Sequence, residues 1–457
     1  LPIQQWFFEK SEGNSHKDIS HFNQSVLLGI DKTINESIVK RSIEQIKAQH
    51  DALRFKYYKK DNEWHQVYEP ESEVSGVINE DFREVKGKDE LKNIIKETSE
   101  KYQRSLDIEK GELIRVVWIQ TPQSETQNRL LIVIHHLAVD GVSWRILLED
   151  LELLVSGLRS GGKTDLGKKG SSYRQWFEEL QKYGQGERLL NQRTYWENVS
   201  RNITELPDDK DYEDETNIKI KIRAKDILNL SIKLGEKETR QLLQDVPSVY
   251  HTEINDILLS ALAKTISGYS KTNKVTIELE GHGREELESE SDTDQTTDTT
   301  HTVGWFTTHY PVLFDLNEVK EESDLIKSIK EQLRKIPDKG IGYGVLKYIN
   351  KEKVLQNSKD PDIIFNYLGQ LDNVLGNSKW FTSATESAGS SSSGEYVQSN
   401  KISVNAIVQN NELILNWSYS KNHFKNETIE ELSKTFKANL ESLIVHCIEK
   451  DKTGKVF

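Results

Sequence analysis

An apolar run that ends in two histidines dominates the pattern of hydrophobic and polar positions along this chain. Leu131 to Ile134 has no polar break and is rich in β-branched residues, which is typical of a strand buried on both faces. His135 and His136 follow directly, so we expect them at the end of this strand. Because successive side chains of a strand point to opposite faces, only one of the two imidazoles can face a given cavity.

A turn and an amphipathic helix are predicted after the histidines. Asp140 lies four residues after His136, and Gly141 permits a tight turn. We expect Ser143 to cap a helix whose apolar positions recur as far as Gly157. Asp140 itself is typical of a turn, so its expected task is to hold the shape of the loop.

Strands and helices alternate in the second half of the chain. ILNLSIKL at 227–234 predicts a strand, INDILLSALAKTI at 254–266 predicts a helix, and KVTIELE at 274–280 predicts another strand. This alternation is typical of an α/β sandwich, also described as α+β, in which helices cover a sheet.

The strand KVTIELE has a regular alternation of apolar and polar positions. Thr276, Glu278 and Glu280 are the polar members, which predicts one apolar face and one polar face. Glu280 ends the polar face, and a turn flanked by glycines follows and carries Arg284. Taken alone, such a turn is typical of a strand exit with solvated charges.

The length of the chain, 457 residues, is too great for one ordinary hydrophobic core, so two lobes are expected. Residues 160–172 form a polar linker that is followed by two helical patterns. We place the boundary near residue 180, with an N-terminal lobe over 1–180 and a C-terminal lobe over 181–457.

Composition excludes several classes of protein. The net charge of −13 argues against a protein that binds nucleic acid, because phosphates require basic partners. The sequence has neither a signal peptide nor an apolar segment of membrane-spanning length, so a cytoplasmic location is expected. The single cysteine, Cys447, excludes an intramolecular disulfide and a cysteine-rich zinc site. The absence of methionine suggests a piece of a larger polypeptide.

One match to a nucleotide-binding motif is rejected on its context. GLRSGGKT at 157–164 fits the P-loop pattern, but a phosphate-binding loop needs a strand before it and a helix after it. Here a predicted helix precedes the motif, and no apolar periodicity follows it. The glycines are interpreted as the end of the helix.

The segment HHLAVDGVSW at 135–144 resembles the His-His-x-x-x-Asp-Gly signature of the condensation superfamily of nonribosomal peptide synthetases. Condensation domains usually continue with Trp and then Ser. Here the order is Val142, Ser143 and Trp144, which resembles the epimerization branch of the superfamily.

Other stretches resemble epimerization domains in the family order. In the stretch HTVGWFT, His301 stands where the family motif has an arginine, so the role of that arginine is not carried over to this chain. Trp305 and Phe306 in the same stretch are interpreted as core residues. The acidic loop 285–300 is predicted to be mobile, and the serine-rich run 387–396 to be a flexible hairpin tip. The matching stretches are PIQQWFFE at 2–9, EGHGREE at 280–286, HTVGWFT at 301–307 and FNYLGQ at 365–370.

The resemblance implies a fold and an activity. The fold is a pseudodimer of two chloramphenicol acetyltransferase-like lobes with a channel between them. The activity is epimerization of the α-carbon of an aminoacyl or peptidyl thioester from L to D. By motif position His136 is the expected catalytic base, while His135 faces the other way and supports the local structure. Glu280 matches a glutamate proposed in the family as the catalytic partner of the histidine.

Five further residues are assigned supporting roles through the resemblance. Arg54 is the candidate partner of Asp140, because an arginine at this place commonly pairs with the motif aspartate. Asn366 and Tyr367 match residues that lie near the reacting thioester. Arg284 and Tyr367 are expected either to donate hydrogen bonds to the enolate oxygen or to hold the glutamate.

The resemblance also implies partners. The substrate arrives on the 4′-phosphopantetheine arm of an upstream peptidyl carrier domain, expected in the same polypeptide, and a condensation domain or docking partner follows. We expect neither a metal nor an organic cofactor in this domain. Two alternatives stay open: a condensation domain that forms peptide bonds, and an inactive docking module of the same superfamily.

Overall fold

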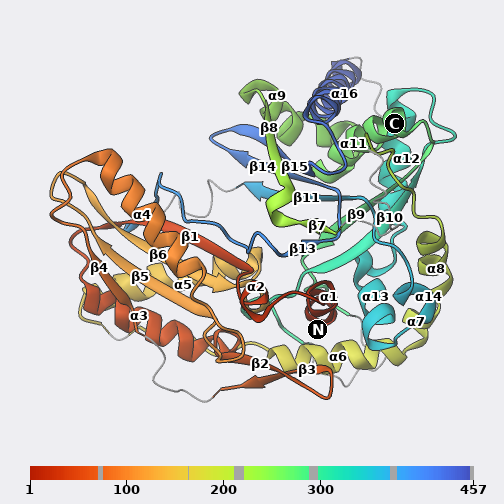
Figure 1. Cartoon of the computed structure of the whole chain (residues 1–457). Helices are drawn as coiled ribbons and strands as arrows, with labels where there is room; N and C mark the ends of the chain where they lie inside the picture. The colour runs from red at the N-terminus through yellow and green to blue at the C-terminus, as the bar shows by residue number, and fades with distance from the viewer. Residues whose placement is uncertain (70–75, 163, 210–220, 288–296, 371–377, 453–457) are drawn as a thin grey trace.

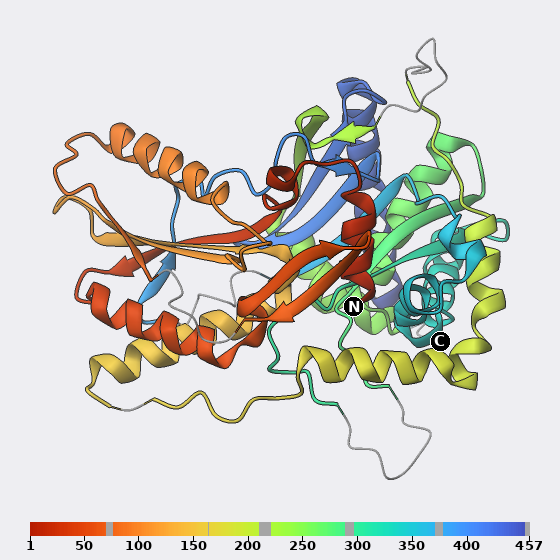
Figure 2. The same cartoon turned by 60° about the horizontal axis from the view of Figure 1, so that its bottom comes forward.

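The computed structural model folds the chain into two lobes, each built on its own sheet (Figure 1). It describes residues 1–69, 76–162, 164–209, 221–287, 297–370 and 378–452. The predicted α/β class with two lobes is confirmed. The division near residue 180 stays a prediction, and that position lies inside helix α6 (Tyr173–Gln185), which runs along the lower edge of the molecule in Figure 2.

The strands form two large sheets within the described residues. The order in the first sheet is β12 (Phe381–Ser383), β1 (Asn23–Asp31), β6 (Gln127–His135), β5 (Ile114–Gln120) and β4 (Ile78–Asp81). The order in the second is β10 (Thr308–Asp315), β9 (Lys274–Gly281), β11 (Ile363–Gln370), β14 (Ile402–Gln409), β15 (Glu412–Ser420) and β8 (Ile227–Leu234). Two small ribbons pair β2 (Phe55–Lys60) with β3 (Glu63–Tyr68) and β7 (Ile222–Arg223) with β13 (Val397–Gln398).

Helices pack around both sheets. The longer ones are α1 (Pro2–Lys10), α3 (Glu36–Gln49), α4 (Lys88–Gln103), α5 (Gly141–Arg159), α6, α8 (Arg193–Arg201), α11 (Ile254–Ser270), α12 (Glu322–Arg334) and α16 (Asn426–Lys452). The shorter ones are α2 (His16–Ile19), α7 (Glu187–Leu190), α9 (Glu236–Arg240), α10 (Val246–Tyr250), α13 (Ile341–Gly344) and α14 (Lys353–Gln356). Across the described part of the chain, no helix combines the length and the apolar character that crossing a bilayer requires.

Strand β6 is buried on both faces, as its apolar run predicts. Leu131 and Val133 belong to the core that includes α4, whereas Ile132 and Ile134 belong to the core that includes α3 and α5. The strand ends at His135, and His136 begins a short 3-10 turn. The two imidazoles therefore diverge because the chain turns between them, and not only because strand positions alternate.

Helix α5 begins earlier than the sequence predicts. Asp140, and not Ser143, is its N-cap: the Asp140 carboxylate accepts a hydrogen bond from the Ser143 backbone N–H at 2.8 Å. An aspartate in extended backbone conformation satisfies this otherwise unpaired donor and places a negative charge at the helix N-terminus. The predicted cap is corrected, and Asp140 gains a structural task.

The predicted polar face of strand β9 is buried and not exposed. Thr276 accepts a hydrogen bond from the Thr204 backbone N–H at 3.0 Å, and Glu278 is only 5% exposed. The alternation in the sequence reports polarity and not exposure, because polar groups can be buried when they have partners. Glu280, at the end of the strand, is more accessible, with 28% of its side chain exposed.

A segment of the second half returns to the first lobe. Strand β12 pairs with β1, with Phe381 opposite Ile30, and appears in blue beside the red and orange strands (Figure 1). The serine-rich run continues this contact, because the Asn23 backbone N–H donates to the Ser391 carbonyl at 2.7 Å. The predicted flexible hairpin tip at 387–396 is therefore corrected to a packed crossing segment.

Candidate active site

A cavity of about 980 Å³ lies between the lobes and receives side chains from both halves of the chain. His136 and Asp140 line it from the first half, and Glu280, Asn366 and Tyr367 line it from the second. The ends of strands β6 and β9 and the middle of strand β11 therefore converge on one space. The structure brings together most of the residues that the sequence selects as a site.

The imidazole of His136 is held at both nitrogens. Its Nδ1 lies 2.8 Å from the Val139 carbonyl oxygen, to which it donates a hydrogen bond. Its Nε2 lies 3.0 Å from the side-chain nitrogen of Gln24 on strand β1. Trp305 packs against the ring at a centroid distance of 4.1 Å. These contacts fix the orientation of a side chain that remains partly exposed to the cavity.

Gln24 and the Val139 carbonyl together determine which nitrogen of His136 carries the proton. The indole N–H of Trp144 donates to Gln24 Oε1 at 2.8 Å, so the Gln24 amide nitrogen must face His136. An amide nitrogen can only donate, so Nε2 of His136 must accept. The imidazole is therefore the Nδ1–H tautomer with a lone pair on Nε2.

Burial favours the neutral form of His136 and lowers its pKa to about 4. The nearby aspartate Asp140 opposes this shift without cancelling it. At neutral pH the imidazole is thus uncharged and able to accept a proton, which is the state that a general base needs.

His135 lies outside the cavity and is completely buried. Its Nε2 donates to the Ile19 carbonyl oxygen at 2.9 Å, and its Nδ1 accepts from the Leu137 backbone N–H at 3.1 Å. Burial lowers its pKa to about 3. Both ring nitrogens of the neutral form have hydrogen-bond partners. The ring therefore links the end of helix α2 to the 3-10 turn that begins at His136.

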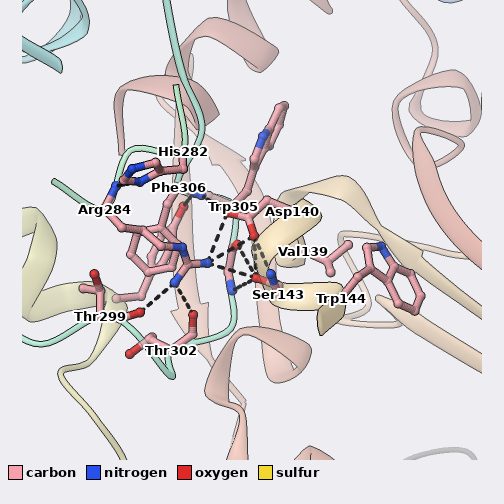
Figure 3. A network of polar contacts seen from close by, with 12 residues as sticks. Val139, Asp140, Ser143, Trp144, His282, Arg284, Thr299, Thr302, Trp305 and Phe306 are labelled. Atoms are coloured by element: carbon pink, nitrogen blue, oxygen red, sulfur yellow. Dashed lines mark hydrogen bonds and ion pairs between the residues drawn. The ribbon is translucent and has the colours of Figure 1, made fainter. Parts of the chain in front are cut away.

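Asp140 forms a buried ion pair with Arg284 across the two halves (Figure 3). Nη2 of Arg284 lies 3.1 Å from each carboxylate oxygen, and Nη1 donates to the backbone carbonyls of Thr299 and Thr302. The guanidinium also lies over the Phe306 ring at 3.9 Å. Arg284 therefore fastens the loop 297–306 to the start of helix α5.

This ion pair corrects the expected partner of Asp140. Arg54 is not the partner of Asp140: it pairs with Asp51 at 2.6 Å and donates to the Lys47 carbonyl at 3.0 Å. Arg284 takes the place assigned to Arg54, because the loop 297–306 carries the chain back over helix α5. Both terminal nitrogens of Arg284 are occupied by these contacts, and its expected role at the enolate oxygen or at the glutamate stays a prediction.

Glu280 is surrounded by a second polar cluster. Nδ2 of Asn366 donates to Glu280 Oε2 at 2.7 Å, and Nε2 of His309 lies 3.7 Å from Oε1. Burial raises the pKa of Glu280, and His309 partly opposes this shift. A raised pKa favours the protonated form of a carboxyl group, and the protonated form can donate a proton.

The remaining predicted residues differ in their placement. Tyr367 lines the cavity and is half-buried, and burial raises the pKa of its phenol. His301 is exposed. Of the acidic loop 285–300, residues 288–296 lie outside the described residues, so the prediction of mobility stays a prediction. Trp305 and Phe306 are each 2% exposed, in agreement with their interpretation as core.

Two residues that line the cavity, Gln24 and His309, are not identified by the sequence analysis. Gln24 carries no signal beyond being polar in a strand, and its importance depends on a neighbour, Trp144, that is distant in sequence. His309 lies in the stretch HTVGWFTTHYPV, and its register opposite Glu280 could have been found by pairing this strand with KVTIELE.

Among the described residues, no group of three or more metal-binding side chains is arranged to hold an ion.

Known proteins similar to this chain are synthetases and their domains. Surfactin synthase subunit 2 of Bacillus subtilis (strain 168) is 39% identical over 458 residues, covering 98% of this chain and 12% of that protein. Bacitracin synthase 1 of Bacillus licheniformis is 38% identical over 452 residues, covering 99% of this chain and 8% of that protein. The chain thus spans about a tenth of the length of these relatives.

Solved structures share the fold over nearly the whole chain. The epimerization domain from the third module of tyrocidine synthetase B has a TM-score of 0.85 and 33% identity, covering 99% of this chain and 96% of that one. The condensation domain from Monacolin K polyketide synthase MokA has a TM-score of 0.74 at 12% identity, covering 97% and 96%, which shows likeness of fold. The architecture is therefore the chloramphenicol acetyltransferase-like one. Since the profile described as "Condensation domain" also matches residues 1–456, the chain belongs to the condensation-domain family.

Proposed function

We propose that this domain epimerizes the α-carbon of an aminoacyl or peptidyl thioester from L to D in nonribosomal peptide synthesis. The observation that carries the proposal is the placement of His136 and Glu280 on one cavity, on opposite lobes. A neutral imidazole and a carboxyl group with raised pKa are the two groups that inversion needs. The similarity to an epimerization domain of tyrocidine synthetase B supports the same activity.

The proposed reaction moves two protons on opposite faces of the substrate. When the substrate enters, Nε2 of His136 gives up its hydrogen bond from Gln24 and takes the α-proton of the L-configured thioester, and the electron pair of that C–H bond moves into the enolate. Glu280 then gives its proton to the α-carbon from the other face, and the carbonyl reforms. Tyr367 is the cavity residue that we assign to the enolate oxygen as a hydrogen-bond donor.

We propose that the reaction needs neither a metal nor an organic cofactor bound to this domain. The thioester already acidifies its α-proton, and the two side chains supply both proton transfers. The 4′-phosphopantetheine arm belongs to the substrate, since it carries the aminoacyl or peptidyl group into the cavity.

The proposed partners follow from the length of the relatives. This chain corresponds to a small part of long synthetases, which is consistent with carrier and condensation partners in the same polypeptide. We propose that an upstream peptidyl carrier domain delivers the substrate and that a downstream condensation domain or docking partner receives the product.

Condensation is the second candidate, because the family match bears that name and the histidine motif is common to the family. The test is to incubate the protein with a panel of L-aminoacyl and peptidyl carrier proteins and to determine the configuration of the product. A D/L mixture supports the epimerase. A new peptide bond in the presence of a second loaded carrier selects condensation, and the absence of both reactions selects a docking module.

Delivery by the carrier is tested by comparing substrates. Remote contacts with the carrier and the arm position the α-carbon, so free amino acids and small thioesters should react far more slowly than carrier-bound ones. Comparable efficiency on both classes would contradict the proposed substrate.

A further inference from the structure

His309 lies directly opposite Glu280 in the paired strands β10 and β9. Glu278 is two residues before Glu280, so it projects from the same face of the sheet. Nδ1 of His309 is 3.3 Å from Glu278 Oε1, and Nε2 is 3.7 Å from Glu280 Oε1. One imidazole thus stands between two carboxylates, one of which is the proton donor of the proposed function.

The two carboxylates differ in how completely they are held. Glu278 has only 6% of its side chain exposed and accepts a hydrogen bond from Nδ2 of Asn400 at 2.7 Å. Glu280 has 28% exposed and opens to the cavity. Glu278 is therefore a fixed anion, while Glu280 is the carboxyl that substrate can reach.

The ionization of His309 follows from these neighbours. Burial works against a charge, but Glu278 and Glu280 outweigh it and raise the pKa of His309. Burial also works against a charge on Glu278, and His309 outweighs it and lowers the pKa of Glu278. The contact between Nδ1 and Glu278 is an ion pair, although its alignment falls short of a hydrogen bond.

The other groups around His309 leave this charge in place. From helix α1, Trp6 packs on its ring at a centroid distance of 4.6 Å. Lys10, also from α1, is paired with Asp360 at 2.5 Å. His136, which lies on the same cavity, is neutral near pH 7 because its own pKa is low. The imidazolium therefore has Glu278 as its nearest fixed opposite charge, and Glu280 becomes a second one when it has given up its proton.

We propose that His309 is a positioning residue, a fixed cation that stabilises the carboxylate formed on Glu280 when Glu280 gives its proton to the α-carbon. The inference rests on the proposed function. In this step the O–H bond of Glu280 breaks, a C–H bond forms at the α-carbon, and the electron pair of the O–H bond stays on the carboxylate. His309 keeps both of its protons, and between turnovers solvent water takes the α-proton from His136 and returns a proton to Glu280.

The test is the pH profile of His309→Gln, measured as kcat/KM for L-to-D and D-to-L conversion of a carrier-bound thioester. Without the cation, Glu280 holds its proton more tightly, so inversion should slow about tenfold or more. The basic limb of the profile should move to higher pH. Both directions should change together, because the equilibrium between the two diastereomers does not depend on the enzyme.

A second variant separates charge from shape. Glu278→Gln keeps His309 but removes the anion that keeps it charged, so this variant should resemble the wild type at low pH and His309→Gln at high pH. If thermal unfolding shows that His309→Gln does not fold, Glu278→Gln alone tests the role of His309. The role of His309 would be overturned if the wild type inverts its substrate and the basic limb of the pH profile lies at the same pH in both variants as in the wild type. If the wild type shows no inversion of the carrier-bound thioester, the proposed function itself is overturned.

Discussion

The indole N–H of Trp144 donates a hydrogen bond to Gln24 Oε1 at 2.8 Å, and through it the tautomer of His136 is set. This relationship gives the order Val142, Ser143, Trp144 a physical meaning. Side chains two positions apart on a helix point about 200° apart. A tryptophan at position 142 would therefore project away from Gln24, and the amide would lose the partner that orients it.

Replacing Gln24 by Glu tests this arrangement with almost no change in size. A glutamate can still accept from Trp144, but it presents a carboxylate to Nε2 and favours the imidazolium. The pKa of His136 should rise from about 4, and the acid limb of the pH profile should move up by about one unit or more. An unchanged acid limb in Gln24→Glu would mean that Gln24 does not face His136 in the working enzyme.

Replacing His136 by Ala should abolish inversion while the fold persists. Loss of a general base lowers rates by about 10²- to 10⁴-fold. The side chain is partly exposed, so the cost in stability should be small. Product configuration and thermal unfolding are measured on the same preparation, and unfolding of the variant would instead assign His136 a structural role.

Replacing Glu280 by Gln removes the proton donor but keeps the shape of the side chain. Inversion should fall by about 100-fold or more, while His136 continues to exchange the α-proton of the L substrate. The measurement is deuterium uptake from heavy water into separate L and D carrier-bound substrates. Equal loss of exchange from both would make Glu280 an electrostatic residue, and unchanged inversion would exclude it from the chemistry.

Replacing Arg284 by Met should destabilise the protein by about 3–5 kcal/mol, because it leaves the buried Asp140 carboxylate without its countercharge. Chemical denaturation measures the free energy of unfolding. The double variant Asp140→Asn, Arg284→Met should recover part of the loss, since no charge is then buried alone. Arg174→Met, in an exposed ion pair, is the control and should have little effect.

Stability should decrease in acid through His135. Its pKa is about 3 in the folded protein against 6.5 in the unfolded chain, so between these values the unfolded chain binds more protons. The free energy of unfolding should fall as the pH is lowered through this window, by up to about 1.4 kcal/mol per pH unit for this group. His135→Gln should show a shallower dependence, whereas His301→Gln, which also removes an imidazole but at an exposed position, should keep the wild-type dependence.

The sequence predicts those parts of the site that depend on local pattern. The apolar run before His136 and the alternation that ends at Glu280 both place a reactive side chain at the end of a strand, and the structure has both strands there. The family resemblance adds the expectation that the two ends meet across the lobes.

The parts that depend on tertiary pairing could not be read from pattern. The resemblance indicates Arg54 as the partner of Asp140, and nothing local in the sequence reveals that the loop 297–306 returns over helix α5 and brings Arg284 to Asp140. Gln24 and His309 matter through their cross-strand neighbours, and register is set by the pairing of whole strands. The burial of Glu278 was missed for the same reason, since Asn400 and His309 reach it from distant segments.

The strand β12 makes the order of synthesis matter for folding. Strand β1 leaves the ribosome before its edge partner, because Phe381, which pairs with Ile30, follows about 350 residues later. At about 5–20 residues per second, the open edge of β1 waits for roughly 20–70 seconds. An unpaired edge strand is a site of aggregation. A nascent chain that stops after the first lobe would keep that edge exposed, so the first lobe reaches its final form only when the second is nearly complete.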